Sequence, residues 1–129
     1  MTHQPSRRFP KAARLLSSPD FRRVFDARQS VADRVLVIYG LRNDLPFSRL
    51  GLAVSKKSGN AVARNVWKRQ LREAFRLQQE HLPAGFDIVV LPKRGAKPEH
   101  DAIQESLCDL MQRLVTSKQR HRKSEGRNA

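Results

Sequence analysis

The densest group of functional side chains in this sequence lies between Ser55 and Arg76. Seven Lys or Arg residues fall in this run, against one carboxylate, Glu73. Cations at fixed spacing suit a folded polyanion, because each neutralised phosphate releases condensed counterions. Nuclease chemistry would instead need converging carboxylates for metals, or histidines placed for acid–base work. The run therefore predicts a surface that binds phosphates, with no catalytic residue in it.

The spacing inside the run predicts a helix from Asn60 to about His81, after a polar turn in which Gly59 supplies backbone freedom. Asn60 is a suitable N-cap, because its side chain can accept a hydrogen bond from an orphan N–H. One helix face is apolar and is expected to be buried, with Ala63, Val66, Trp67, Leu71, Ala74 and Phe75 on it. The candidate RNA-binding residues are Lys56, Lys57, Arg64, Asn65, Lys68, Arg69, Arg72 and Arg76. The ordinary alternative is a charged face that only contacts solvent.

The composition agrees with a nucleic-acid partner. The chain has 129 residues, enough for one domain with a modest core, and a formal net charge of +14. Such an imbalance is typical of nucleic-acid-binding proteins, although anionic membrane surfaces are an alternative. No apolar run could span a bilayer, and the N-terminus lacks the apolar segment of a secretory signal. The single cysteine, Cys108, fits a reducing cytoplasm, so we expect a cytoplasmic protein without a membrane partner.

The other predicted elements are shorter. A first helix is expected from Ser18, with Pro19 in its first turn, to about Arg28. The predicted strands are 34–41 with a lead-in at 31–34, 48–54 and 86–91, and a last helix is expected from Pro98 to about 116. We expect a flexible basic segment at 1–14, one domain at 15–117 and a disordered basic tail at 118–129.

This order of elements predicts an α+β fold. The apolar faces of the long and last helices would cover a single sheet in a two-layer sandwich. A crossover from strand to long helix to strand would by the general rule be right-handed.

The segment SKKSGNAVARN…KRQLREAFR closely resembles the signature of the bacterial ribonuclease P protein component. Further matches occur in the correct order, in DFRRVF at 20–25, LVIYGL at 36–41, RLGLAVSKK at 49–57 and GFDIVVLPKRGA at 85–96. The resemblance covers about residues 14–116. It implies the order α-β-β-β-α-β-α, a mainly antiparallel four-stranded sheet and a left-handed β-α-β crossover, against the general rule.

The signature departs from the family pattern at one point. The family usually reads Arg-Asn-Arg at the helix start, whereas this chain reads Arg64-Asn65-Val66, followed by Trp67 where an aliphatic residue is commoner. Loss of one cation should remove a phosphate contact, on the order of one unit of salt slope.

The resemblance implies that a partner RNA is the catalyst and the protein its cofactor. The complex would remove the 5′ leader of precursor transfer RNA, using Mg²⁺ bound mainly by the RNA, with one protein per RNA. The protein would bind the catalytic RNA through its basic helix and would hold no catalytic residue or metal itself.

Three aromatic residues have two interpretations. Phe21 and Phe25, four residues apart on a helix, are on pattern alone ordinary core residues. The resemblance places Phe21, Phe25 and Tyr39 in a cleft that holds the leader, where rings stack on bases with little sequence preference. We expect at least one of the three to be mainly structural.

Other classes of function remain as alternatives. A ribosomal or RNA-chaperone protein would share the charge and the small α+β fold, and a self-sufficient metal nuclease would cut the precursor alone. The acidic residues Asp101, Glu105 and Asp109 read as a solvated stripe of the last helix. A DNA-binding module is disfavoured, since no helix-turn-helix pair or zinc spacing appears.

Overall fold

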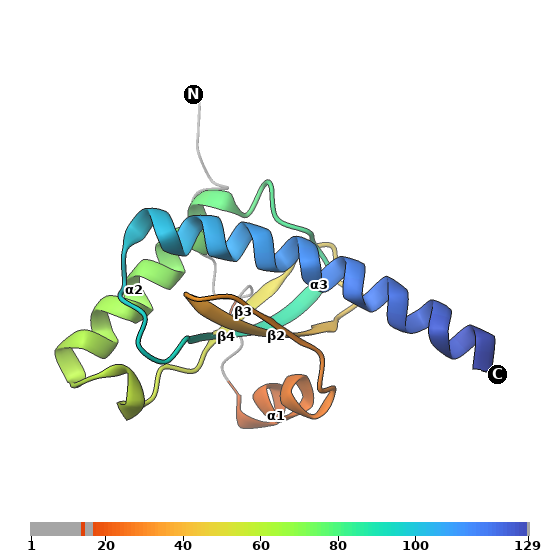
Figure 1. Ribbon diagram of the computed structural model, residues 1–129, viewed down its shortest axis with the longest axis horizontal. Coiled ribbons are helices and arrows are strands. Elements are labelled where there is room, and N and C mark those ends of the chain that lie inside the picture. Colours follow the sequence, from red (N-terminus) through yellow and green to blue (C-terminus); the bar gives the residue numbers. More distant parts are fainter. Residues whose placement is uncertain (1–13, 15–16, 129) are drawn as a thin grey trace.

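The helices and strands of the chain follow the predicted order (Figure 1). The computed structural model describes residue 14 and residues 17–128. The elements are α1 (Ser18–Asp26), β1 (Ser30–Ala32), β2 (Leu36–Arg42), β3 (Arg49–Leu52), the 3₁₀ turn η3 (Lys56–Ser58), α2 (Ala61–Gln78), β4 (Phe86–Pro92) and α3 (His100–Asn128). The α+β class and the α-β-β-β-α-β-α order are confirmed.

The four strands form one mixed sheet in the order β1-β2-β4-β3. The β1–β2 and β2–β4 pairs are antiparallel, and β3 and β4 are parallel neighbours joined through α2. The mainly antiparallel sheet is thus confirmed, while the left-handed sense of the crossover stays a prediction. Because β3 pairs only with β4 among these strands, it forms one edge of the sheet.

The two faces of the sheet are covered by different helices. Successive strand residues point to opposite faces, so Ile38 and Val90 face one side while Tyr39 and Val89 face the other. The apolar faces of α2 and α3 bury the first side and form the main core, as the two-layer prediction requires. The helix α1 lies on the opposite side of the sheet and adds a partial third layer there (Figure 1).

A close approach of α3 to β2 depends on a glycine. A Cβ atom added to Gly40 would lie 2.2 Å from Cδ2 of Leu114, which is fully buried in the main core. Any larger residue at this position would push α3 away from the sheet. Gly40 is therefore required for the packing of α3 on β2.

The helix ends differ from the predictions at both ends of the chain. The helix α1 begins at Ser18 as predicted, with Ser17 as its N-cap, whose Oγ accepts a hydrogen bond from the Asp20 amide, but it ends at Asp26, before the predicted end near Arg28. The helix α3 extends to Asn128, beyond its predicted end near 116, and the predicted disorder of 118–129 stays a prediction. No proline interrupts this stretch, and its Lys, Arg, Gln and Glu residues favour helix. Within the described part of the chain no helix is long and apolar enough to cross a membrane.

Candidate nucleic-acid interface

The turn before α2 is fixed by local hydrogen bonds. Ser55 Oγ accepts from the Lys57 amide at 3.2 Å, and Asn60 Oδ1 accepts from the Ala63 amide at 2.9 Å, which confirms the predicted N-cap. Gly59 has a φ of +126°, a conformation that side chains other than glycine rarely adopt. The turn therefore holds the backbone at Lys56 and Lys57 in a defined conformation at the start of α2.

The helix α2 is anchored by its apolar face. Trp67, Leu71, Ala74 and Phe75 are buried in the main core, while Ala63 and Val66 are half-buried. At 3.6 residues per turn, the candidate residues of α2 fall within an arc of roughly 140°. Of the full candidate set, Lys56, Lys57, Asn65, Arg69 and Arg72 are exposed, and Arg64, Lys68 and Arg76 are half-buried. The structure thus brings the predicted cations together beside a buried anchor.

Arg76 differs from the other cations of the set. Its guanidinium forms an ion pair with Glu73 at 2.6 Å, which lowers the pKa of Glu73 and raises that of Arg76. Arg69 and Arg72 have no such ion pair among the described residues. The positive charge available to a ligand is therefore concentrated away from the Glu73–Arg76 pair.

The three predicted aromatic residues lie together on the opposite face of the sheet. Phe21, Phe25 and Tyr39 are all half-buried and pack around two fully buried residues, Val24 and Val89. The rings of Phe25 and Tyr39 meet edge to face, with centroids 4.9 Å apart and planes at 73°. The buried position of α1 is thus a valine, while its two phenyl rings keep part of their surface in solvent.

A buried carboxylate that the sequence analysis missed links α1 to the sheet. Asp87, at the start of β4, has no solvent-exposed side-chain surface. It accepts hydrogen bonds from Arg23 at 2.7 Å, from Arg49 at 2.6 and 2.7 Å, and from Asn43 at 2.9 Å. Arg23 lies on α1 and Arg49 on β3, so one side chain joins three elements. We call these four residues the Asp87 cluster.

The electrostatics of the Asp87 cluster favour the charged carboxylate. Burial alone would raise the pKa of Asp87, but the hydrogen bonds from Arg49, Asn43 and Arg23 outweigh it and lower that pKa below its ordinary value. The sequence carried a signal for this cluster. Asp87 interrupts the apolar run of β4, and a buried acid needs partners.

The remaining titratable side chains do not form a metal centre in the described residues. No group of three or more His, Cys, Asp or Glu side chains there is placed to hold a metal ion. Asp101, Glu105 and Asp109 are exposed on α3, and Asp109 pairs with Arg113 at 3.0 Å. Lys93, Arg94 and Lys97 are exposed in the loop after β4.

Comparisons with known proteins identify the family. The model of the family Ribonuclease P matches residues 9–115. The ribonuclease P protein component of Marinobacter nauticus is 44% identical over 119 residues, covering 90% of this chain and 86% of that protein. The one from Thermotoga petrophila is 36% identical over 111 residues, covering 82% and 95%.

Solved structures agree with this assignment. The RNase P protein of Staphylococcus aureus has a TM-score of 0.70 at 39% identity and covers 79% of this chain and 94% of its own. The RNase P protein from Thermotoga maritima has a TM-score of 0.70 at 34% identity and covers 78% and 96%. The chain belongs to the ribonuclease P protein family, and it is a protein component of that transfer-RNA-processing nuclease.

Proposed function

We propose that the chain is the non-catalytic subunit of ribonuclease P and binds a catalytic RNA through the basic face of α2. The exposed and half-buried cations along one arc of α2 carry this proposal, because Trp67, Leu71 and Ala74 of the same helix are buried in the main core. A rigid anchor holds the charges at fixed spacing, so little ordering entropy is lost when phosphates bind. Lys56, Lys57, Arg64, Asn65, Lys68, Arg69, Arg72 and Arg76 form this proposed interface.

The half-buried rings on the other face of the sheet support a second role. Phe21, Phe25 and Tyr39 would hold the single-stranded 5′ leader of precursor transfer RNA. Bases stack on aromatic rings with a gain of about 1–3 kcal/mol each and with little sequence preference. A subunit that binds the leader would favour the precursor over the mature product, which lacks it.

The remaining parts of the proposal concern the assembly. The RNA would supply the cleavage chemistry and hold most of the Mg²⁺, which would stabilise charge on the reacting phosphate. One protein would bind one RNA, in the cytoplasm. The protein would contribute charge screening and substrate binding.

Charge reversal at Arg69 and Arg72 tests the RNA-binding role. The double variant Arg69→Glu, Arg72→Glu should weaken assembly with the catalytic RNA and reduce the slope of affinity against salt by roughly two units. The control is Arg34→Glu, Arg113→Glu, which makes the same change in net charge at residues outside the proposed interface. If both double variants changed the affinity and the salt slope equally, binding would depend only on net charge, and a specific interface on α2 would be contradicted.

The alternatives predict different activities. Family membership favours ribonuclease P over a ribosomal or RNA-chaperone protein. Addition of the purified protein should stimulate cleavage of a 5′-extended precursor by the catalytic RNA at low Mg²⁺. Cleavage by the protein alone, after removal of all RNA, would instead indicate a self-sufficient nuclease.

A further inference from the structure

The helix α1 is tied to the sheet along one flank and carries its aromatic rings on the other. Val24 is fully buried and packs on the sheet. At about 100° per residue, Phe21 and Phe25 lie roughly 60° and 100° to one side of Val24. Arg23 lies roughly 100° to the other side. There its guanidinium donates a hydrogen bond to the carboxylate of Asp87 at 2.7 Å.

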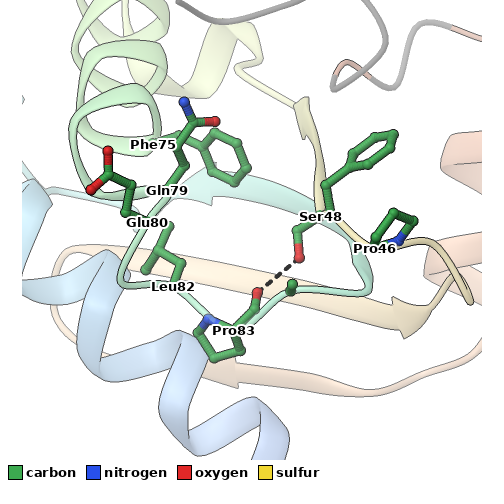
Figure 2. A pocket seen from close by; sticks show the side chains of 9 residues that line it. Pro46, Ser48, Phe75, Gln79, Glu80, Leu82 and Pro83 are labelled. Carbon is green, nitrogen blue, oxygen red and sulfur yellow. Dashed lines mark hydrogen bonds between the residues drawn. The ribbon is translucent and has the colours of Figure 1, made fainter. Parts of the chain in front are cut away.

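The sheet end of this contact is held firmly in place. Arg49 donates to both carboxylate oxygens of Asp87, at 2.6 and 2.7 Å. Ser48, directly before β3, donates to the Pro83 carbonyl at 2.8 Å, as Figure 2 shows, and accepts from the Phe86 amide at 3.1 Å. These bonds join the start of β3 to the start of β4. The carboxylate is therefore a fixed point, relative to which α1 is positioned.

The core keeps its polar contacts without Arg23. Asp87 would still accept two hydrogen bonds from Arg49 and one from Asn43. The Arg23 side chain is 44% exposed, so its loss leaves no unpaired charge in the interior, and solvent screens its ion pair. The contact is thus better suited to setting where α1 lies than to stabilising the sheet.

The rings depend on where α1 lies. Phe21 and Phe25 are half-buried, and the ring of Phe25 meets that of Tyr39 edge to face, with centroids 4.9 Å apart. The attraction between aromatic rings depends on their distance and relative orientation. A shift of α1 across the sheet would therefore change this contact and the ring surface that stays open to a ligand.

We propose that Arg23 is a positioning residue for the single-stranded leader. Tied to Asp87, it would hold α1 where Phe21 and Phe25 can stack on RNA bases, without touching the leader itself. The inference rests on the proposed leader-binding role of the rings. Without the tie, a smaller fraction of molecules would hold α1 in the competent position, and the apparent affinity for the leader would fall with that fraction.

A pair of neighbouring charge removals gives the first test. Arg23→Gln, in the protein reconstituted with the catalytic RNA, should raise the dissociation constant of a 5′-extended precursor by roughly fivefold. Mature transfer RNA affinity and the cleavage rate at saturating precursor should not change. Arg22→Gln is the matched control, because it removes the same charge from an exposed residue of the same helix, and it should alter none of these values. Equal weakening by both variants would mean that only charge matters, and would overturn the inference.

A double-mutant cycle separates positioning from direct contact with RNA. If Arg23 acts through the rings, Arg23→Gln should cause no further loss of precursor affinity in a Phe21→Ala, Phe25→Ala background. Losses that multiply would show that Arg23 acts independently, and would overturn its positioning role. A loss in the ring variant with none in Arg23→Gln would overturn this inference alone. No loss in either would contradict leader binding by the rings as well.

Nuclear magnetic resonance spectroscopy of the full-length protein tests the tie without RNA. The nuclear Overhauser contact between the rings of Phe25 and Tyr39 should weaken in Arg23→Gln and persist in Arg22→Gln. An undiminished contact in Arg23→Gln would show that α1 keeps its position without the tie to Asp87, and would overturn the proposal.

Discussion

The two faces of the sheet carry similar residues but are covered in different ways. On one face Ile38, Ile88 and Val90 are fully buried beneath α2 and α3. On the other face Tyr39 and Leu91 stay half-buried beside α1, which contributes one fully buried side chain, Val24. There the Asp87 cluster adds polar contacts that hold α1 on the sheet.

This difference shows how a small domain can divide its roles. Complete apolar burial stabilises the fold but leaves no surface for a ligand. A short helix held by a buried ion pair needs less apolar contact, so the rings beside it stay partly accessible. We interpret the α2–α3 face as the source of stability and the α1 face as the surface that binds the leader.

Truncation of leucines on the two faces should separate these roles. Leu71→Ala opens a cavity in the main core, where Leu71 is 1% exposed, and should cost about 3–4 kcal/mol of unfolding free energy. Leu91→Ala on the α1 face should cost less than about 1.5 kcal/mol, because this side chain already contacts solvent. Urea unfolding measures both values. Similar losses would contradict the division between the two faces.

Neutralisation of the buried Asp87 should cause the next largest loss of unfolding free energy. Asp87→Asn leaves Arg49 and Arg23 facing an uncharged group and should cost about 2–3 kcal/mol, discounted because both arginines keep solvent contact. The control is Asp109→Asn, which breaks an exposed pair with Arg113 and should cost at most about 0.5 kcal/mol. If urea unfolding gave the same small loss for both, the Asp87 cluster would not hold α1.

Protonation of Asp87 at low pH should destabilise the protein in the same way as the Asp87→Asn substitution. Because the folded-state pKa of Asp87 is lowered, its contribution is complete above the unfolded-state value near 3.8 and is lost as pH falls through the folded-state value. Acid unfolding of the wild type should therefore steepen below about pH 4. The Asp87→Asn variant should lose less stability than the wild type as pH falls below about 4. If the two proteins lost stability equally with falling pH, a stabilising charge on Asp87 would be contradicted.

The sequence predicted well those features that depend on neighbouring residues. The apolar face of α2, the Asn60 cap and the buried run of β4 follow from helical spacing, capping chemistry and hydrophobicity, and the structure confirms them. The mainly antiparallel sheet and the β-α-β crossover followed instead from the family resemblance, and the order β1-β2-β4-β3 of the strands in the sheet was not predicted. The helix α3 extends beyond its predicted end near 116, through charged residues that are good helix formers.

The partners of Asp87 could not be predicted from local pattern, although its place in the apolar run of β4 signals a buried acid. Arg23 and Arg49 are 64 and 38 residues away from Asp87 in the sequence, and they meet it only after β3, β4 and α1 are assembled. The structure brings the three predicted aromatic residues together, and their role in leader binding stays a prediction. That their rings are half-buried, with Val24 as the buried residue of α1, depends on how α1 lies on the sheet.

The most direct test of the account is the ratio of precursor to mature transfer RNA affinity, measured with the reconstituted complex of protein and catalytic RNA. Phe21→Ala and Phe25→Ala should each weaken precursor binding by about five- to a hundredfold and leave mature transfer RNA binding unchanged. Phe47→Ala, an exposed phenylalanine in the β2–β3 loop, is the control and should change neither. Equal weakening for precursor and mature transfer RNA would show that these rings only support the fold, and would contradict leader binding on the α1 face.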